Sequence, residues 1–243
     1  MNEVNLNTLW VYLSASPLLG LVVTLLAYII SYRLYEMANR HPLLNPVALA
    51  MVLLIVLLLV TDTPYSRYFE GAQFVHFLLG PATVALAVPL YQQISKLRAL
   101  WSVVLISVMV GVLFAALSAV GIAWLLGAST ETLLSLAPKS VTTPVAMGIS
   151  ETIGGLPSLT AVMVVATGIL GAVFGTRILD LLGVKDDGVR GVAMGVAAHG
   201  IGTARAFQVN AQMGAFSGLA MALSALVTAL FLPWVLKLIG LTG

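Results

Sequence analysis

Long apolar runs alternate with short polar segments along most of this chain. A helix that spans a bilayer needs about 20 mostly apolar residues. Runs of about that length predict membrane-spanning helices at residues 10–30, 43–60, 74–90, 101–126, 161–182 and 216–238. Two further segments, 133–153 and 189–209, contain more glycine, threonine and charge, so they are either broken helices or re-entrant hairpins. We therefore expect an all-α, polytopic transmembrane fold with six to eight spans.

Composition places this pattern in a membrane. The 243 residues are 60% hydrophobic and 8% charged, and the mean hydropathy is +1.07, whereas an average soluble protein carries about 25% charged residues. The net charge of +2 and the scattered basic residues predict no nucleic-acid partner. There is no cysteine, and the first ten residues lack the basic region of a cleavable signal peptide. We therefore expect the first helix to be retained in a single membrane domain of residues 1–243.

Basic residues in the predicted loops orient the chain. Arg33 and Arg40 follow the first span, and Lys96 and Arg98 follow the third, whereas the loop after the second span holds charges of both signs. Cytoplasmic loops of membrane proteins carry an excess of Lys and Arg. The first and third loops are therefore predicted to lie in the cytoplasm, and the amino terminus outside.

A short pattern of small apolar residues recurs at 47–50, 84–87, 145–148 and 192–195. The first copy follows Asn45 and Pro46, and the third follows Thr143 and Pro144. Each pair predicts a helix start, with Asn45 or Thr143 as the N-cap and proline at the first helical position. Matching interrupted segments in two halves are typical of repeat-built transporters, although small residues also recur by coincidence in membrane helices. The predicted repeat halves are about 42–127 and 133–240, and these spacings leave open whether they are inverted.

A polar, proline-interrupted segment around Lys139 is the strongest candidate for a binding site. Backbone outside a helix must be covered by protein or line a water-filled cavity in a membrane. Lys139 supplies a positive charge, and Ser140 and Thr142 supply hydroxyl donors. The helix starts at Thr143 and Asn45 present unpaired N–H groups, which attract anions. The alternative is that Lys139 extends to the membrane interface and the hydroxyls bind local backbone, but an ionisable residue in a membrane favours a site.

A second polar segment, 198–205, holds further candidates. Two glycines over three residues permit a chain break or the close approach of another backbone. Thr203 and Arg205 are candidate substrate ligands, because a guanidinium can hold a carboxylate through two hydrogen bonds. His199 titrates near neutral pH, so it and Glu151 are the candidate proton carriers. The alternative is that Arg205 and His199 lie at the cytoplasmic end of a short helix, and that Glu151 pairs with a basic residue.

Nothing in the sequence is typical of an enzyme. It contains no metal-ligand spacing, phosphate-binding loop, nucleophile motif or carboxylate pair. We therefore expect no catalytic residue, no metal and no cofactor.

Several segments together carry a family resemblance, at residues 42–46, 81–91, 138–144, 154–155, 168–175, 199 and 202–205. The run Pro-Lys-Ser-Val-Thr-Thr-Pro at 138–144 is long enough to be specific. In these segments the sequence closely resembles the LrgB/CidB family of bacterial inner-membrane proteins, and the likeness covers nearly the whole chain.

The resemblance implies two kinds of function. Members of this family are described as antiholin-like regulators of murein hydrolase activity and cell lysis, working beside a small LrgA/CidA-type membrane partner. The family also resembles the carboxyl-terminal part of the chloroplast glycolate/glycerate translocator, and bacterial members are linked to pyruvate movement. A holin-like pore requires that several chains associate around a wide hole. A carboxylate carrier instead requires a small anion site formed by a cation, hydroxyls and helix starts. The residues of this chain favour the carrier.

We therefore predict a transporter of small monocarboxylates of the pyruvate, glycolate or glycerate type in the bacterial inner (plasma) membrane. The alternative is an antiholin-like modulator of murein hydrolase export and cell lysis. The predicted partners are a small carboxylate anion, membrane lipid and a small LrgA/CidA-type subunit. A homodimer is the expected assembly, because two-fold dimers are the commonest oligomers. A stripe of small residues suits close helix packing, either within the chain or between subunits; it comprises Gly168, Gly171, Ala172 and Gly175.

Overall fold

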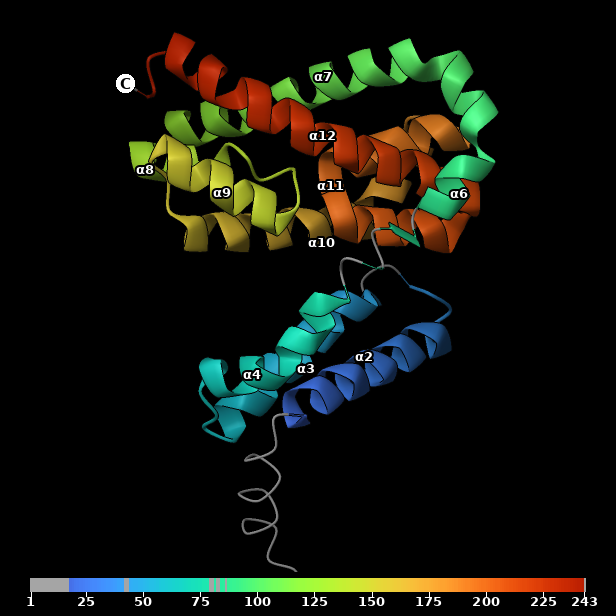
Figure 1. Cartoon of the computed structure of the whole chain (residues 1–243), viewed down its shortest axis with the longest axis vertical. Helices are drawn as coiled ribbons and strands as arrows, with labels where there is room; N and C mark the ends of the chain where they lie inside the picture. Colours follow the sequence, from blue (N-terminus) through green and yellow to red (C-terminus); the bar gives the residue numbers. More distant parts are fainter. Residues whose placement is uncertain (1–17, 42–43, 79–80, 82–83, 86, 243) are drawn as a thin grey trace, which may run out of the picture. The chain divides into compact units, whose positions relative to one another are not determined.

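The computed structural model describes residues 18–41, 44–78, 81, 84–85 and 87–242. The chain divides into two compact units, Met1–Ala85 and Leu86–Gly243. The helices of the first unit are α2 (Leu19–Met37), α3 (Pro46–Val60) and α4 (Tyr65–Phe77) (Figure 1). Those of the second unit are α6 (Ala87–Gln92), α7 (Ile94–Leu125), α8 (Thr130–Leu136), α9 (Thr143–Ile153), α10 (Pro157–Leu181), α11 (Asp187–Val209) and α12 (Ala211–Leu238). Every regular element of the described residues is helical, which confirms the predicted fold class.

Four helices in the described part of the chain are long and apolar enough to cross a membrane, namely α2, α7, α10 and α12. Helix α3 is also apolar but has only 15 residues. These helices confirm a helical membrane protein, while the count of six to eight spans stays a prediction. Helix α2 continues beyond the end of the span expected at 10–30 and ends at Met37. Residues 10–17 of that expected span lie outside the described residues. The span expected at 74–90 includes the end of α4 and the start of α6, and residues 79–80, 82–83 and 86 of it lie outside the described residues.

In the first unit, local signals fix one helix start as predicted. The side-chain oxygen of Asn45 accepts hydrogen bonds from the backbone N–H groups of Val47 and Ala48, at 3.0 and 3.2 Å. Pro46, the first helical residue, has no N–H to leave unpaired. The predicted N-cap role of Asn45 is therefore confirmed. Its side-chain oxygen is engaged by its own helix.

In the second unit, α11 and α12 pack most closely. A Cβ atom added at Gly195 of α11 would lie 2.9 Å from the Cβ of Ala220 and 3.0 Å from the backbone nitrogen of Met221. One added at Gly191 would lie 2.8 Å from the Cβ of Phe216. Figure 1 shows α7 along one side of this unit, α10 along the other, and α12 crossing obliquely between them. Glycine on α11 therefore lets the two helix backbones touch, as small residues do in membrane proteins.

The small-residue stripe of α10 faces α11 within the same chain. A Cβ added at Gly175 would lie 2.5 Å from the sulfur of Met194, and one added at Gly168 would lie 2.7 Å from the ring of His199. At Gly171 the added atom would meet the side chain of Ala198. The sequence left open whether these glycines pack within the chain or between subunits. The structure shows that they pack within the chain. They are no longer an argument for a dimer.

The segment predicted at 133–153 is a broken helix. Helix α8 ends at Leu136 and α9 begins at Thr143. Hydroxyls satisfy the backbone around this break: Ser135 Oγ accepts from the N–H of Leu156 at 2.7 Å. Thr160 Oγ1 lies 2.8 Å from the carbonyl oxygen of Ser135 and 2.7 Å from Ser150 Oγ. Because Ser135, Ser150 and Thr160 are all 0% exposed, solvent cannot reach these groups to replace the hydrogen bonds.

Replacing Thr160 by valine is expected to destabilise the second unit. Valine keeps the volume but leaves the Ser135 carbonyl and the Ser150 hydroxyl without this partner, which costs about 1–3 kcal/mol. Thermal unfolding of the purified protein should therefore show a melting temperature lower by about 2–4 °C per kcal/mol lost. Thr152→Val is the matched control, since that exposed hydroxyl only bonds the Ile149 carbonyl of its own helix. Equal shifts in the two variants would contradict the role of the buried network.

Candidate functional site

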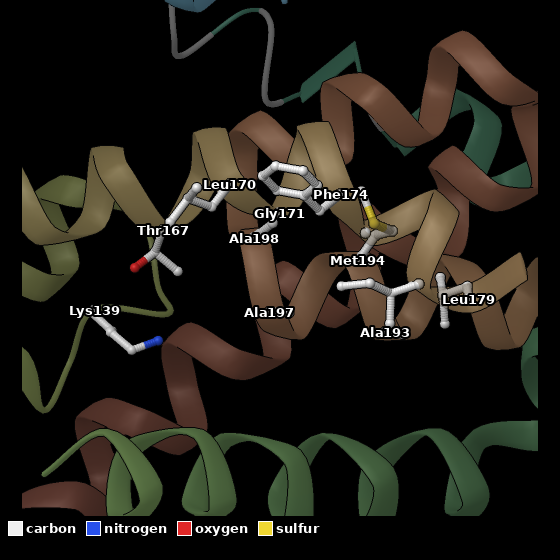
Figure 2. A pocket seen from close by; sticks show the side chains of 12 residues that line it. Lys139, Thr167, Leu170, Gly171, Phe174, Leu179, Ala193, Met194, Ala197 and Ala198 are labelled. Atoms are coloured by element: carbon white, nitrogen blue, oxygen red, sulfur yellow. The ribbon is translucent and has the colours of Figure 1, made fainter. Parts of the chain in front are cut away.

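The candidate site is a cavity of about 620 Å³ in the second unit. Helices α10 and α11 form most of its wall, and the loop between α8 and α9 contributes Lys139 (Figure 2). Its volume lies within the range of about 300–1,000 Å³ that is usual for small-molecule sites. The lining residues are Lys139, Thr167, Leu170, Gly171, Phe174, Gly175, Ile178, Leu179, Ala193, Met194, Ala197 and Ala198.

Among the described residues, Lys139 is the only charged one that lines this cavity. Its side chain is half-buried, and its ammonium donates to Ser140 Oγ across a long 3.4 Å. None of the ion pairs found in the described part of the chain includes Lys139. A half-buried cation without a carboxylate partner favours an anion as ligand.

The start of α9 lies directly after this lysine in the chain. Thr142 is the N-cap and Thr143 the first helical residue, so the cap lies one residue earlier than predicted. The Thr142 side chain makes no capping hydrogen bond, in contrast to Asn45 of α3. The first N–H groups of α9 are therefore not engaged by the cap side chain. Such groups attract anions.

Helix α11 is kinked at His199, which has φ 41° and ψ −130°. Nε2 of the buried imidazole donates to the carbonyl oxygen of Val164 on α10, at 3.0 Å. Gly202 then packs against the helix before the kink, where an added Cβ would lie 2.9 Å from the carbonyl oxygen of Met194. The segment predicted at 189–209 is thus a broken helix. The glycines permit the close approach, but the break itself falls on the histidine.

Of the predicted site residues that the structure describes, only Lys139 lines the cavity. Thr203 is buried and shares a 2.9 Å hydrogen bond with Ser217 of α12. Arg205 donates to the side chain of Gln208 at 3.2 Å. Glu151 is exposed on α9. Asn45 belongs to the first unit, so the convergence of its helix start with that of α9 stays a prediction.

The structure therefore places Lys139 in the cavity lining, with Ser140 as its hydrogen-bond partner, and adds a residue that the sequence analysis missed. Thr167 lines the cavity beside the small-residue stripe of α10. A threonine next to Gly168 in an apolar helix was the available signal. Its significance depends on α11 packing against that stripe, which the sequence does not show.

Comparison with known proteins identifies close relatives. The profile of the LrgB-like family matches residues 24–238. The protein YwbG of Bacillus subtilis is 36% identical over 222 residues, covering 90% of this chain and 97% of its own. The holin-like protein CidB of Staphylococcus epidermidis is 32% identical, covering 91% and 96%, and the antiholin-like protein LrgB of Bacillus cereus is 32% identical, covering 93% and 98%. No solved structure matches the chain.

Proposed function

Because the chain belongs to the LrgB-like family, we propose that it is an antiholin-like modulator of murein hydrolase export and cell lysis. This was the alternative drawn from the sequence, and the names of the relatives support it better than carboxylate transport. We further propose that it works in the bacterial inner membrane with its amino terminus outside, as a homodimer beside a small LrgA/CidA-type subunit.

The packing of the second unit supports a modulator over a pore formed by this unit alone. Glycines bring α11 into contact with α10 and α12, and buried hydroxyls bond to one another or to backbone. Close packing of this kind leaves no wide passage among α10, α11 and α12. A hole large enough for an enzyme would need other chains, which fits a protein that acts through a partner.

A second candidate, a carrier of small monocarboxylates, is favoured by one observation, the unpaired ammonium of Lys139 in the cavity. In this proposal Lys139, Ser140 and the start of α9 hold the carboxylate. His199 is the first candidate to carry the proton, and Glu151 is the other candidate for that role. Arg205 and Thr203 assist from the second half of α11.

The variant Lys139→Ala separates the two functions. A modulator should tolerate it, so cells that express the variant with the small partner should lyse at the wild-type rate and release the same hydrolase activity. A carrier should lose saturable uptake of labelled pyruvate and glycolate into liposomes, while the folded protein stays in the membrane. The matched control is Lys185→Ala, an exposed lysine in the loop before α11.

Each function has a result that contradicts it. Lysis that does not depend on the small partner in either variant would exclude the modulator. Full uptake by Lys139→Ala would exclude a carrier that holds the carboxylate at Lys139, and leakage of a trapped dye too large for a carrier would exclude the carrier itself.

A further inference from the structure

We propose that the cavity between α10 and α11 binds a long-chain fatty acid, with the carboxylate at Lys139 and the acyl chain along α10. This goes beyond both proposed functions and requires neither of them, although it uses the lysine that the carrier would also use.

The lining of the cavity is the first observation that points to an acyl chain. Apart from Lys139 and Thr167, every lining residue is apolar or glycine. A three-carbon hydroxy or keto acid would lose its water over most of this wall and find few donors there. A methylene chain instead gains from leaving water for an apolar wall. The cavity therefore suits a ligand with one acidic end and a long apolar body.

The length of the cavity is the second observation. Figure 2 shows Lys139 and Thr167 at one end and Leu179 at the other. Thr167 and Leu179 are twelve residues apart on α10, which corresponds to about 18 Å along a helix. This is close to the extended length of the acyl chain of a common fatty acid. A small acid at Lys139 would leave most of the 620 Å³ unfilled.

Charge and access are the third observation. In the part of the chain that the structure describes, the only hydrogen bond of the Lys139 ammonium is the long one to Ser140, so a carboxylate would supply the charge-assisted bond that it lacks. The side chains of Leu170 and Ile178 line the cavity and are 57% and 52% exposed. A single chain can therefore enter sideways, as it would from the apolar part of a bilayer. The single ammonium matches a single carboxylate, and the apolar wall matches a single acyl chain.

The test is photo-crosslinking of the full-length protein in neutral phosphatidylcholine nanodiscs with a palmitic acid analogue that carries a diazirine on its chain. Mass spectrometry should find saturable labelling on the α10 and α11 segments that line the cavity. Unlabelled palmitate should compete, and pyruvate should not. Lys139→Gln should weaken binding by about tenfold or more, since it removes a charge-assisted hydrogen bond, whereas Lys139→Arg should retain it.

A cavity-filling variant has a matched control on the same helix. Ala197→Phe places a ring in the cavity and should abolish saturable labelling. Ala204→Phe changes an exposed alanine outside the lining and should leave it unchanged. Unchanged melting temperatures show that the variants are folded. If Lys139→Gln does not fold, competition by the neutral alcohol of the same chain length tests the role of the charge in the wild type.

Four results would overturn the proposal. Equal labelling of Lys139→Gln, Ala197→Phe and the wild type would indicate ordinary contact with bilayer lipid. If the neutral alcohol of the same chain length binds as tightly as palmitate, the pairing of the carboxylate with Lys139 has no role in binding. Competition by pyruvate would assign the cavity to small acids, and stronger competition by phosphatidylglycerol than by palmitate would assign it to a membrane phospholipid.

Discussion

Gly195→Ala is expected to lower the melting temperature of the protein by about 6–12 °C, using about 2–4 °C per kcal/mol for a chain of this size. The added methyl would lie 3.0 Å from the backbone nitrogen of Met221 and would also meet the carbonyl oxygen of Ser217. These are backbone atoms of α12, so they cannot move aside as a flexible side chain would. Relief requires α11 and α12 to separate, at a cost at the upper end of the usual overpacking range, about 3 kcal/mol.

The matched control is Gly148→Ala on α9, where nothing lies within 4 Å of the added atom. There the substitution should be neutral or should stabilise the helix by about 0.5–1 kcal/mol, because alanine is the better helix former. Thermal unfolding followed by circular dichroism measures both variants. If the two behave alike, the contact between α11 and α12 does not depend on glycine at position 195.

Local signals in the sequence were enough to predict the long apolar helices and some helix starts, but not α4, which begins at Tyr65 in the segment predicted as a loop of mixed charge. The apolar runs predicted α3, α7, α10 and α12 because length and composition alone decide whether a helix suits a membrane. Asn45 was identified as an N-cap because its side chain and Pro46 act within one turn. At α9 the same reasoning placed the N-cap one residue too late, at Thr143 instead of Thr142. The two side chains are chemically equivalent, so only the backbone conformation distinguishes them.

The site was less predictable because it depends on contacts between distant segments. Lys139 was found because a charge in an apolar chain is conspicuous. Thr167 was not, since its role arises only where α11 lies against α10. For the same reason, the sequence alone did not show that Thr203 bonds to Ser217 and that Arg205 donates to Gln208.

The kink of α11 is the clearest case of a local conformation held by a distant contact. A side chain at positive φ with ψ −130° is rarely tolerated, and such strain costs about 1–3 kcal/mol. The hydrogen bond from His199 to the Val164 carbonyl contributes about 0.5–1.5 kcal/mol, and the ring also packs on Gly168. Because these energies are similar in size, the contact with α10 is what decides between a kinked and a straight helix.

His199→Ala is therefore expected to straighten α11. The chain has no cysteine, so spin labels can be attached to cysteines placed at Val189 and Val209, which are 56% and 42% exposed. The kink shortens the distance between these positions, and its loss should move the distribution measured by double electron–electron resonance toward about 30 Å, the length of a straight helix of 20 residues. Thr203→Val is the control, because it removes the bond to Ser217 of α12 but leaves the bond to α10. Straightening in the control as well would assign the kink to α12, and an unchanged distance in His199→Ala would show that the backbone holds it without the imidazole.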